Sequence, residues 1–191
     1  MCLFSVPVLA GQSDSDLNYE KGKYYALKYQ YDLAKPLLKK AADGGNANAM
    51  LRYAFLINVQ HGQFLAPNAF VYMEKAAENG NEWAMMSLAD SSYSGLSKKE
   101  ASKWRDKLDA KLKPYLEQGD KDAYYIMSQV EFDDHHEKWL SKAAEAGSSK
   151  GMTELADYYL DDGWFILPGS REKKIKELRD AAFKLGNSQA I

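Results

Sequence analysis

The chain has 191 residues, of which 25 are lysine or arginine and 27 are aspartate or glutamate, so its net charge at pH 7 is −2. This balance excludes the strong basic field with which proteins bind the phosphates of nucleic acids. The composition also includes 13 tyrosines and 4 tryptophans, and we expect packing to explain only part of them.

The chain begins with an apolar run, residues 2–10, that contains no charged residue. The run is too short to span a bilayer, which takes about 20 residues. Residues 8–10 fit the small-residue rule for a signal-peptidase cut, although the basic opening of a signal peptide is missing. We therefore interpret residues 1–10 as the remnant of a signal peptide and expect a periplasmic or secreted bacterial protein. The alternative is an apolar tail on a cytoplasmic protein.

The single cysteine, Cys2, lies inside this apolar run. A mature chain that starts at Gly11 would contain no cysteine. We therefore expect neither a disulfide scaffold nor thiol chemistry.

The rest of the chain predicts helices that follow one another in pairs. A capping cluster over residues 13–16 precedes the first pair, and glycine or proline marks most of the turns. The expected helices cover residues 16–28, 31–44, 46–60, 69–79, 82–93, 97–118, 122–132, 137–146, 150–160 and 170–185. Paired, they form five hairpins over about 16–44, 46–79, 82–118, 121–146 and 149–185, followed by a truncated cap, within a single domain over 11–191.

One sequence motif is repeated along these helices. Residues 75–89 read KAAENGNEWAMMSLA, which predicts a helix end, a turn at Gly80 and a new helix with small residues on its packed side. Residues 40–54 and 142–156 are further copies, and residues 114–128 are a degraded one. The anchoring glycines, Gly45, Gly80, Gly119, Gly147 and Gly186, are separated by 35, 39, 28 and 39 residues. Such a period, with two helices per unit, indicates stacked helical hairpins.

The third hairpin is irregular. Trp104-x-x-Lys107 repeats the pattern of Tyr72-x-x-Lys75, but the glycine that ends the unit arrives late, at Gly119. We expect the helix over 97–118 to be lengthened by a turn or slightly more.

The copies of K-A-A-x-x-G-x-x-x-A-x-x-x-L-A, with an aromatic residue three positions before the lysine at Tyr72 and Trp139, resemble Sel1-like repeats. This family is related to the tetratricopeptide repeats. The resemblance covers about residues 17–191 and implies an all-α fold, an α-solenoid of about five antiparallel hairpins. Some secreted members join each helix pair by a disulfide. This chain departs from them, so their properties are not carried over.

Residues that carry chemistry are scarce. His61 lies in a turn, and the adjacent His135 and His136 are expected on a solvated loop, where neighbouring side chains point apart. Residues 161–163 lack the further oxygen ligands of a calcium loop. No nucleophile or phosphate-binding motif occurs. We expect no catalytic residue, no metal and no cofactor, and therefore no enzyme.

Binding is the better hypothesis. The resemblance implies that the first helix of each hairpin lines the concave surface, and the middle of this row is apolar with charge at its ends, as at protein interfaces. The alternative role for Phe55, Trp83 and Tyr125 is packing between adjacent hairpins. The alternative sites of contact with the partner are the 97–118 helix and the apolar loop 164–168. The candidate partner-binding residues are Arg52, Phe55, Trp83, Met86, Asp90, Tyr125, Gln129 and Glu154.

The sequence thus predicts a monomeric, non-catalytic protein–protein interaction module without an integral membrane segment. Its partner would be another protein, held by a periplasmic adaptor or inhibitor. Small exported Sel1-like proteins resemble immunity proteins that neutralise lipase toxins of the type VI secretion system, which is one specific form of this hypothesis. The alternative is a cell-wall-binding or hydrolytic Sel1-like protein, although those proposals concern the cysteine-rich subgroup.

Overall fold

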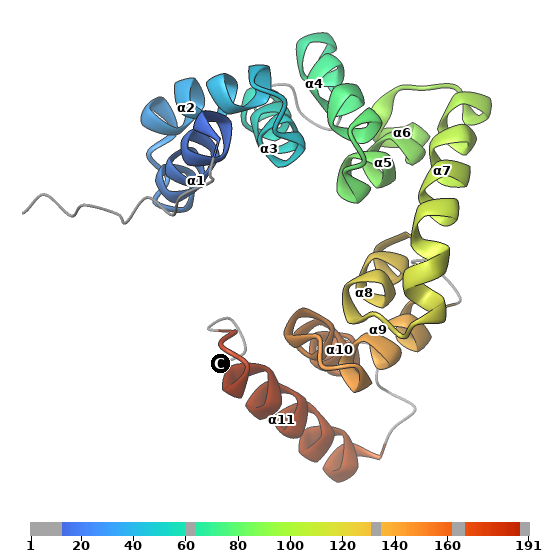
Figure 1. Cartoon of the computed structure of the whole chain (residues 1–191). Helices are drawn as coiled ribbons and strands as arrows, with labels where there is room; N and C mark the ends of the chain where they lie inside the picture. Colours follow the sequence, from blue (N-terminus) through green and yellow to red (C-terminus); the bar gives the residue numbers. More distant parts are fainter. Residues whose placement is uncertain (1–12, 60–63, 131–134, 162–166, 188–191) are drawn as a thin grey trace, which may run out of the picture. The chain divides into compact units, whose positions relative to one another are not determined.

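The computed structural model describes residues 13–59, 64–130, 135–161 and 167–187 (Figure 1). Over these residues it contains eleven helices and no strand, which confirms the all-α class that the sequence predicts, with one helix more than the ten expected. The chain divides into two compact units, residues 1–108 and 109–191, and each is described by itself. The expected signal-peptide remnant, His61 and most of the apolar loop 164–168 lie outside the described residues.

The first unit contains two helical hairpins followed by a shorter pair of helices. Helix α1 pairs with α2 and α3 pairs with α4, and α2 also packs on α3, so that each hairpin is buried against the next. Helix α7 begins in this unit and continues into the second. The helices are α1 (Asp14–Leu27), α2 (Tyr31–Asp43), α3 (Ala47–Asn58), α4 (Pro67–Glu78), α5 (Glu82–Ala89), α6 (Ser91–Ser94) and α7 (Lys98–Glu117).

The second unit contains the end of α7 and two further hairpins. Helix α8 pairs with α9, α9 packs on α10, and α10 pairs with α11. Its helices are α8 (Lys121–Val130), α9 (His136–Glu145), α10 (Ser149–Asp161) and α11 (Pro168–Lys184). Its core joins α9, α10 and α11 through Leu140, Ala144, Leu155, Ala156, Tyr159 and Ile175.

The five anchoring glycines all adopt the left-handed conformation that the sequence predicts, with φ between 74° and 92°. The residue after each glycine donates its backbone N–H to a carbonyl five positions earlier, for example Asn81 to Ala76 at 3.0 Å, which is the Schellman arrangement. In four of the five turns the side chain of that same residue then accepts a backbone N–H of the next helix, as Asn81 does from Ala84 at 2.9 Å. The glycine and the residue after it therefore end one helix and start the next. The other residues that cap the next helix in this way are Asn46, Asp120 and Ser148.

The fourth residue after each of the anchoring glycines Gly45, Gly80, Gly119 and Gly147 is small because two helices meet there. Ala49 and Ala84 are fully buried, and Ala123 is 2 % exposed. Gly151 holds the same place in α10, where an added Cβ would lie 2.8 Å from the Cβ of Ala143. The predicted small-residue register is therefore confirmed.

In the second helix of several hairpins, the aromatic residue and the lysine of the aromatic-x-x-lysine pattern pack on each other. The ammonium nitrogen of Lys75 lies 5.8 Å from the ring centre of Tyr72, and that of Lys142 lies 4.6 Å from the ring centre of Trp139. In α7, Lys107 lies 3.9 Å from the Trp104 ring. Residues three apart share a helix face, so each lysine covers its aromatic neighbour in a cation–π contact.

Two local expectations are wrong. The helix expected over 82–93 is broken at Asp90, whose carboxylate accepts the backbone N–H groups of Ser92 and Tyr93 and starts α6 instead. His136, expected on a solvated loop, is the first residue of α9 and is buried. Its Nδ1 lies 2.9 Å from the carbonyl oxygen of Ser128, to which it donates because a carbonyl only accepts.

Candidate functional site

The first unit holds five of the eight candidate residues, and only one of them presents a large apolar surface. Phe55 in α3 is 42 % exposed, whereas Arg52, Trp83 and Met86 are half-buried. Asp90 is exposed, but its carboxylate caps α6, and the hydrogen bond from the Ser92 hydroxyl holds the pKa of that carboxyl below its usual value. Asp90 therefore has a structural role in the turn.

The second unit brings the other three candidates together in one hydrogen-bonded group. Tyr125 donates its hydroxyl to Glu154 at 2.6 Å, and Gln129 donates its amide to the other oxygen of the same carboxylate at 2.5 Å. Burial, and then the hydrogen bond to the Glu154 carboxylate, raise the pKa of Tyr125. Because Tyr125 and Gln129 lie on α8 and Glu154 lies on α10, this group joins two adjacent hairpins.

Around Phe55 the first unit has an apolar hollow of about 200 Å³. It lies between the junction of α1 and α2 and the second half of α3. Its lining is apolar or aromatic apart from the charged side chain of Arg52. The residues that line it are Ala26, Tyr31, Leu38, Arg52, Phe55, Leu56 and Val59, and we call them the α3 hollow.

Exposed aromatic and aliphatic side chains stand at the edge of the α3 hollow. Val59 is 75 % exposed, and Tyr31 is 46 % exposed. The ring of Tyr31 packs edge-to-face on that of Tyr29, with 6.2 Å between ring centres, and Tyr29 is itself 81 % exposed. Tyr29, Tyr31 and Val59 are not among the eight residues that the sequence predicts for partner binding.

Tyr29 has an unusual backbone for so large a side chain. Its φ is +58°, and among the described residues it is the only one other than glycine with a positive φ. The turn is of the same Schellman type as the glycine turns, since Gln30 donates its N–H to the carbonyl of Tyr25 at 3.0 Å. A left-handed conformation costs a non-glycine residue about 1–2 kcal/mol. The strained residue is thus an exposed tyrosine at the aromatic edge of the hollow.

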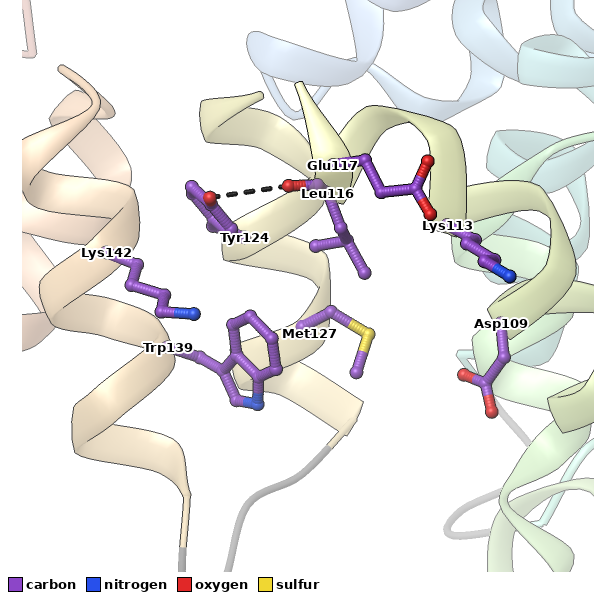
Figure 2. Close-up of a pocket in the computed structure, with 8 residues that line it drawn as sticks. All are labelled: Asp109, Lys113, Leu116, Glu117, Tyr124, Met127, Trp139 and Lys142. Carbon is purple, nitrogen blue, oxygen red and sulfur yellow. Dashed lines mark hydrogen bonds between the residues drawn. The ribbon is translucent and has the colours of Figure 1, made fainter. Parts of the chain in front are cut away.

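A second pocket, of about 410 Å³, lies within the second unit (Figure 2). Trp139, Tyr124 and Lys142 line one side of it, and the end of α7 lines the other. Leu116 and Met127 supply apolar surface between them (Figure 2). The remaining lining residues are Asp109, Lys113 and Glu117, spaced four apart along α7.

This second pocket is polar at its edge, and one of its two lysines, Lys142, packs on aromatic rings of the pocket. The ammonium of Lys142 lies 4.6 Å from the ring centre of Trp139 and 5.4 Å from that of Tyr124. Tyr124 in turn donates its hydroxyl to the carbonyl of Leu116 at 3.4 Å. The α7 edge mixes two carboxylates with one lysine, so it favours no single charge in a ligand.

Within the described ranges, no three histidine, cysteine, aspartate or glutamate side chains gather into a group that could hold a metal ion. Across the same ranges, no helix combines the length and the apolar character that crossing a membrane would need.

No protein-family model matches the sequence, and no curated protein matches it either. Among solved structures, c5321, a protective antigen present in uropathogenic Escherichia coli strains and displaying an SLR fold, aligns over 92 % of this chain with 21 % identity and a TM-score of 0.50. This chain has the Sel1-like repeat (SLR) fold. It spans 39 % of the c5321 chain. A Sel1 repeat protein from Oxalobacter formigenes aligns over 90 % of this chain and 71 % of its own, with 20 % identity and a TM-score of 0.47.

The comparison confirms the expected fold class, an all-α solenoid of Sel1-like hairpins. The eight candidate residues remain predictions as a partner-binding set. Among them, the side chains of Arg52, Asp90, Tyr125, Gln129 and Glu154 form hydrogen bonds inside the protein.

Proposed function

We propose that this chain is a non-catalytic protein–protein interaction module that acts as a monomer and contacts its partner through the α3 hollow. One observation carries the proposal. Phe55, Tyr31 and Val59 are all exposed around an apolar hollow, where folding alone would favour their burial. Exposed apolar patches on soluble proteins commonly mark sites of contact with a protein or membrane.

The chemistry of these side chains suits a protein partner. Aromatic side chains supply a large contact area at a small cost in conformational entropy, so they are enriched at the centres of protein interfaces. The half-buried Arg52 borders the hollow, and arginine is likewise enriched at such centres. The α3 hollow thus has the composition of an interface centre.

The proposal extends to where and how the module acts. Residues 8–10 support export, since they have the pattern of a signal-peptidase site. An exported, non-catalytic binder acts as an adaptor or an inhibitor, and the resemblance to immunity proteins favours an inhibitor of a secreted lipase toxin. This part is tested separately. Protein recovered from the periplasm should begin at Gly11 by mass spectrometry, and soluble cytoplasmic protein with an intact Met1 would contradict export.

The contact surface is tested by photocrosslinking in cells. A benzophenone amino acid at Phe55 replaces one exposed aromatic residue by another, so the fold should be retained. The matched control is Tyr115 in α7, which is 48 % exposed. We expect a covalent adduct with one protein from position 55, identified by mass spectrometry, and none with that protein from position 115. The same adduct from both positions, or none from position 55, would overturn the proposal for this surface.

The partner so identified then allows a quantitative test. Truncating a buried anchor at an interface commonly costs about 2 kcal/mol, which is about thirtyfold in affinity. Phe55→Ser and Tyr31→Ser should each weaken binding by that order, whereas Tyr115→Ser should not. Each variant must first unfold cooperatively near the wild-type temperature, because Phe55 and Tyr31 also contribute to packing.

A further inference from the structure

We infer that the α3 hollow binds a segment of another protein that carries an apolar side chain within about two residues of a carboxylate. The apolar side chain enters the hollow, and Arg52 binds the carboxylate. This inference rests on the proposed function and deepens it by naming the chemistry of the partner. Three observations carry it: the hydrogen bonding of Arg52, the size of the hollow and the conformation of Tyr29.

Arg52 is a half-buried cation with little internal compensation. Its Nε donates to the hydroxyl of Tyr19 at 3.2 Å. In the part of the chain that the structure describes, Arg52 forms no ion pair. The nearby Lys23, which lies 5.8 Å from the ring centre of Tyr19, is instead paired with Glu20 at 3.3 Å. A guanidinium has five N–H donors, so most of those of Arg52 are left for a group from outside.

The surroundings of Arg52 favour a carboxylate over a neutral acceptor. Every other residue of the α3 hollow is uncharged, and most are apolar. Apolar neighbours lower the local dielectric constant, which strengthens the attraction between opposite charges. The planar guanidinium also matches a carboxylate, which can accept two parallel hydrogen bonds from it. An acidic group in the partner would therefore compensate a charge that the first unit leaves uncompensated.

The size of the hollow favours a side chain over a complete small molecule. Its volume is about 200 Å³, whereas pockets for drug-sized ligands and cofactors commonly measure about 300–1,000 Å³. A single apolar side chain of a protein segment would fill it in contact with Phe55 and Leu56. Its neighbours along the segment would then lie at the rim, where Arg52 and the two exposed tyrosines stand.

Tyr29 supplies an independent observation. Its backbone is held in the left-handed conformation, and its ring is 81 % exposed, so internal burial does not offset the strain. Strained backbone that local packing does not repay is characteristic of binding sites. The Tyr29 ring packs edge-to-face on Tyr31, which lines the hollow, and this pair forms an aromatic wall that a bound segment can contact.

The test uses the full chain, immobilised, and a phage-displayed library of random twelve-residue peptides as the probe. Selection is run in parallel on the wild type, Arg52→Gln, Phe55→Ser and Lys35→Gln. Lys35 is an exposed residue of α2, so its replacement removes one positive charge from the same unit without touching the hollow. All four proteins are first compared by thermal unfolding.

We expect peptides enriched on the wild type and on Lys35→Gln to carry an aromatic or aliphatic residue within two positions of aspartate or glutamate. On Arg52→Gln the apolar residue should persist and the acidic preference should disappear. A selected peptide labelled with fluorescein should bind Arg52→Gln about tenfold or more weakly than wild type, and its affinity for wild type should fall as salt is added. Rescue by Arg52→Lys should be partial, because lysine keeps the charge and loses the planar fork.

Enrichment of apolar peptides with no acidic preference, or an acidic preference that survives in Arg52→Gln, would overturn this inference and leave the proposed function standing. Failure to enrich any peptide, or enrichment that Phe55→Ser does not change, would overturn both the inference and the proposed use of this surface.

Discussion

The side-chain amide of Asn81 donates a hydrogen bond to the side-chain oxygen of Asn48, 33 positions earlier, at 2.9 Å. The oxygen of the same Asn81 side chain accepts the backbone N–H of Ala84 at 2.9 Å. Asn46 repeats the arrangement, since it caps α3 and donates to Asp16 at 2.9 Å. One residue per turn thus starts a helix and links that helix to the first helix of the preceding hairpin.

Substitution of Asn81 should separate these two roles. Asn81→Ser keeps an oxygen that can cap α5, as Ser148 caps α10, but is too short to reach Asn48. It should cost about 0.5–1.5 kcal/mol, the usual value of one hydrogen bond. Asn81→Ala loses the cap as well and should cost about 1 kcal/mol more. Urea unfolding of the two variants and the wild type measures both differences.

The control for this pair is Asn48→Ala, which removes the acceptor and leaves the cap. Combined with Asn81→Ser it should add almost nothing, because the hydrogen bond is already gone. Full additivity of the two substitutions would show that the link between the hairpins has no energetic weight.

The second prediction concerns the left-handed turns. Replacing glycine by tyrosine in one turn and tyrosine by glycine in another should change the unfolding free energy by different amounts. A Cβ added at Gly45 would meet nothing within 4 Å, so Gly45→Tyr is opposed by its φ of 92° and by no clash. It should destabilise the protein by about 1–2 kcal/mol. Tyr29→Gly relieves the same kind of strain, and the added flexibility of glycine, about 0.5–1 kcal/mol, offsets part of the gain. Its unfolding free energy should stay within about 1 kcal/mol of wild type, as measured by urea unfolding.

A loss of 2 kcal/mol or more in Tyr29→Gly would show that the ring stabilises the fold and that the strain has a structural reason. A stable Tyr29→Gly variant that binds its partner more weakly would instead separate folding from recognition.

The glycine turns could be predicted from the sequence because their causes are local. Gly80 and the residues around it contain everything that ends one helix and begins another, and the repeat at Gly45 confirms the pattern. The small residue at Ala84 was predictable for the same reason, since its spacing from the glycine is fixed by the turn of the helix.

The roles of the first-helix residues could not be predicted in this way. Whether Tyr125 faces a partner or a neighbouring hairpin depends on Glu154, which is 29 positions away and becomes its hydrogen-bond acceptor only through packing. The sequence predicts a continuous helix through Asp90, but the side chain of Asp90 competes for backbone N–H groups and begins a new helix. The aromatic edge at Tyr29 cannot be predicted from the sequence, because tyrosine is rarely found in a left-handed turn.

The third prediction concerns the close approach of helices at the small positions. Ala84 is fully buried, and Ala84→Leu should overpack the contact and destabilise the protein by about 1–3 kcal/mol. The control is Ala110→Leu in α7, where the alanine is exposed and the larger side chain should change stability by less than about 0.5 kcal/mol. Thermal unfolding distinguishes the two, and equal melting temperatures would contradict the repeat register.

The fourth prediction concerns the group that joins α8 to α10. Tyr125→Phe removes the hydroxyl that donates to Glu154 at 2.6 Å and should cost about 1–2 kcal/mol at pH 8. Gln129 still donates to the other carboxylate oxygen, so the change should not unfold the unit. Tyr115→Phe, at an exposed tyrosine, serves as the control and should have little effect on the unfolding free energy.

The pH dependence of the same variant tests whether the hydrogen bond is the cause. Burial and the Glu154 carboxylate raise the pKa of Tyr125 in the folded protein above its value in the unfolded chain, about 10. Between these two pKa values the unfolded chain holds fewer protons, so stability falls as pH rises. The contribution of Tyr125 is therefore fully present below about pH 10 and is lost above it. The difference in unfolding free energy between wild type and Tyr125→Phe should be largest at pH 8 and should shrink by pH 11, measured by urea unfolding at each pH. A difference close to zero at both pH values would mean that Tyr125 stabilises the hairpin contact through the packing of its ring alone, which phenylalanine keeps. A difference that is present and constant over this range would contradict the raised pKa of Tyr125.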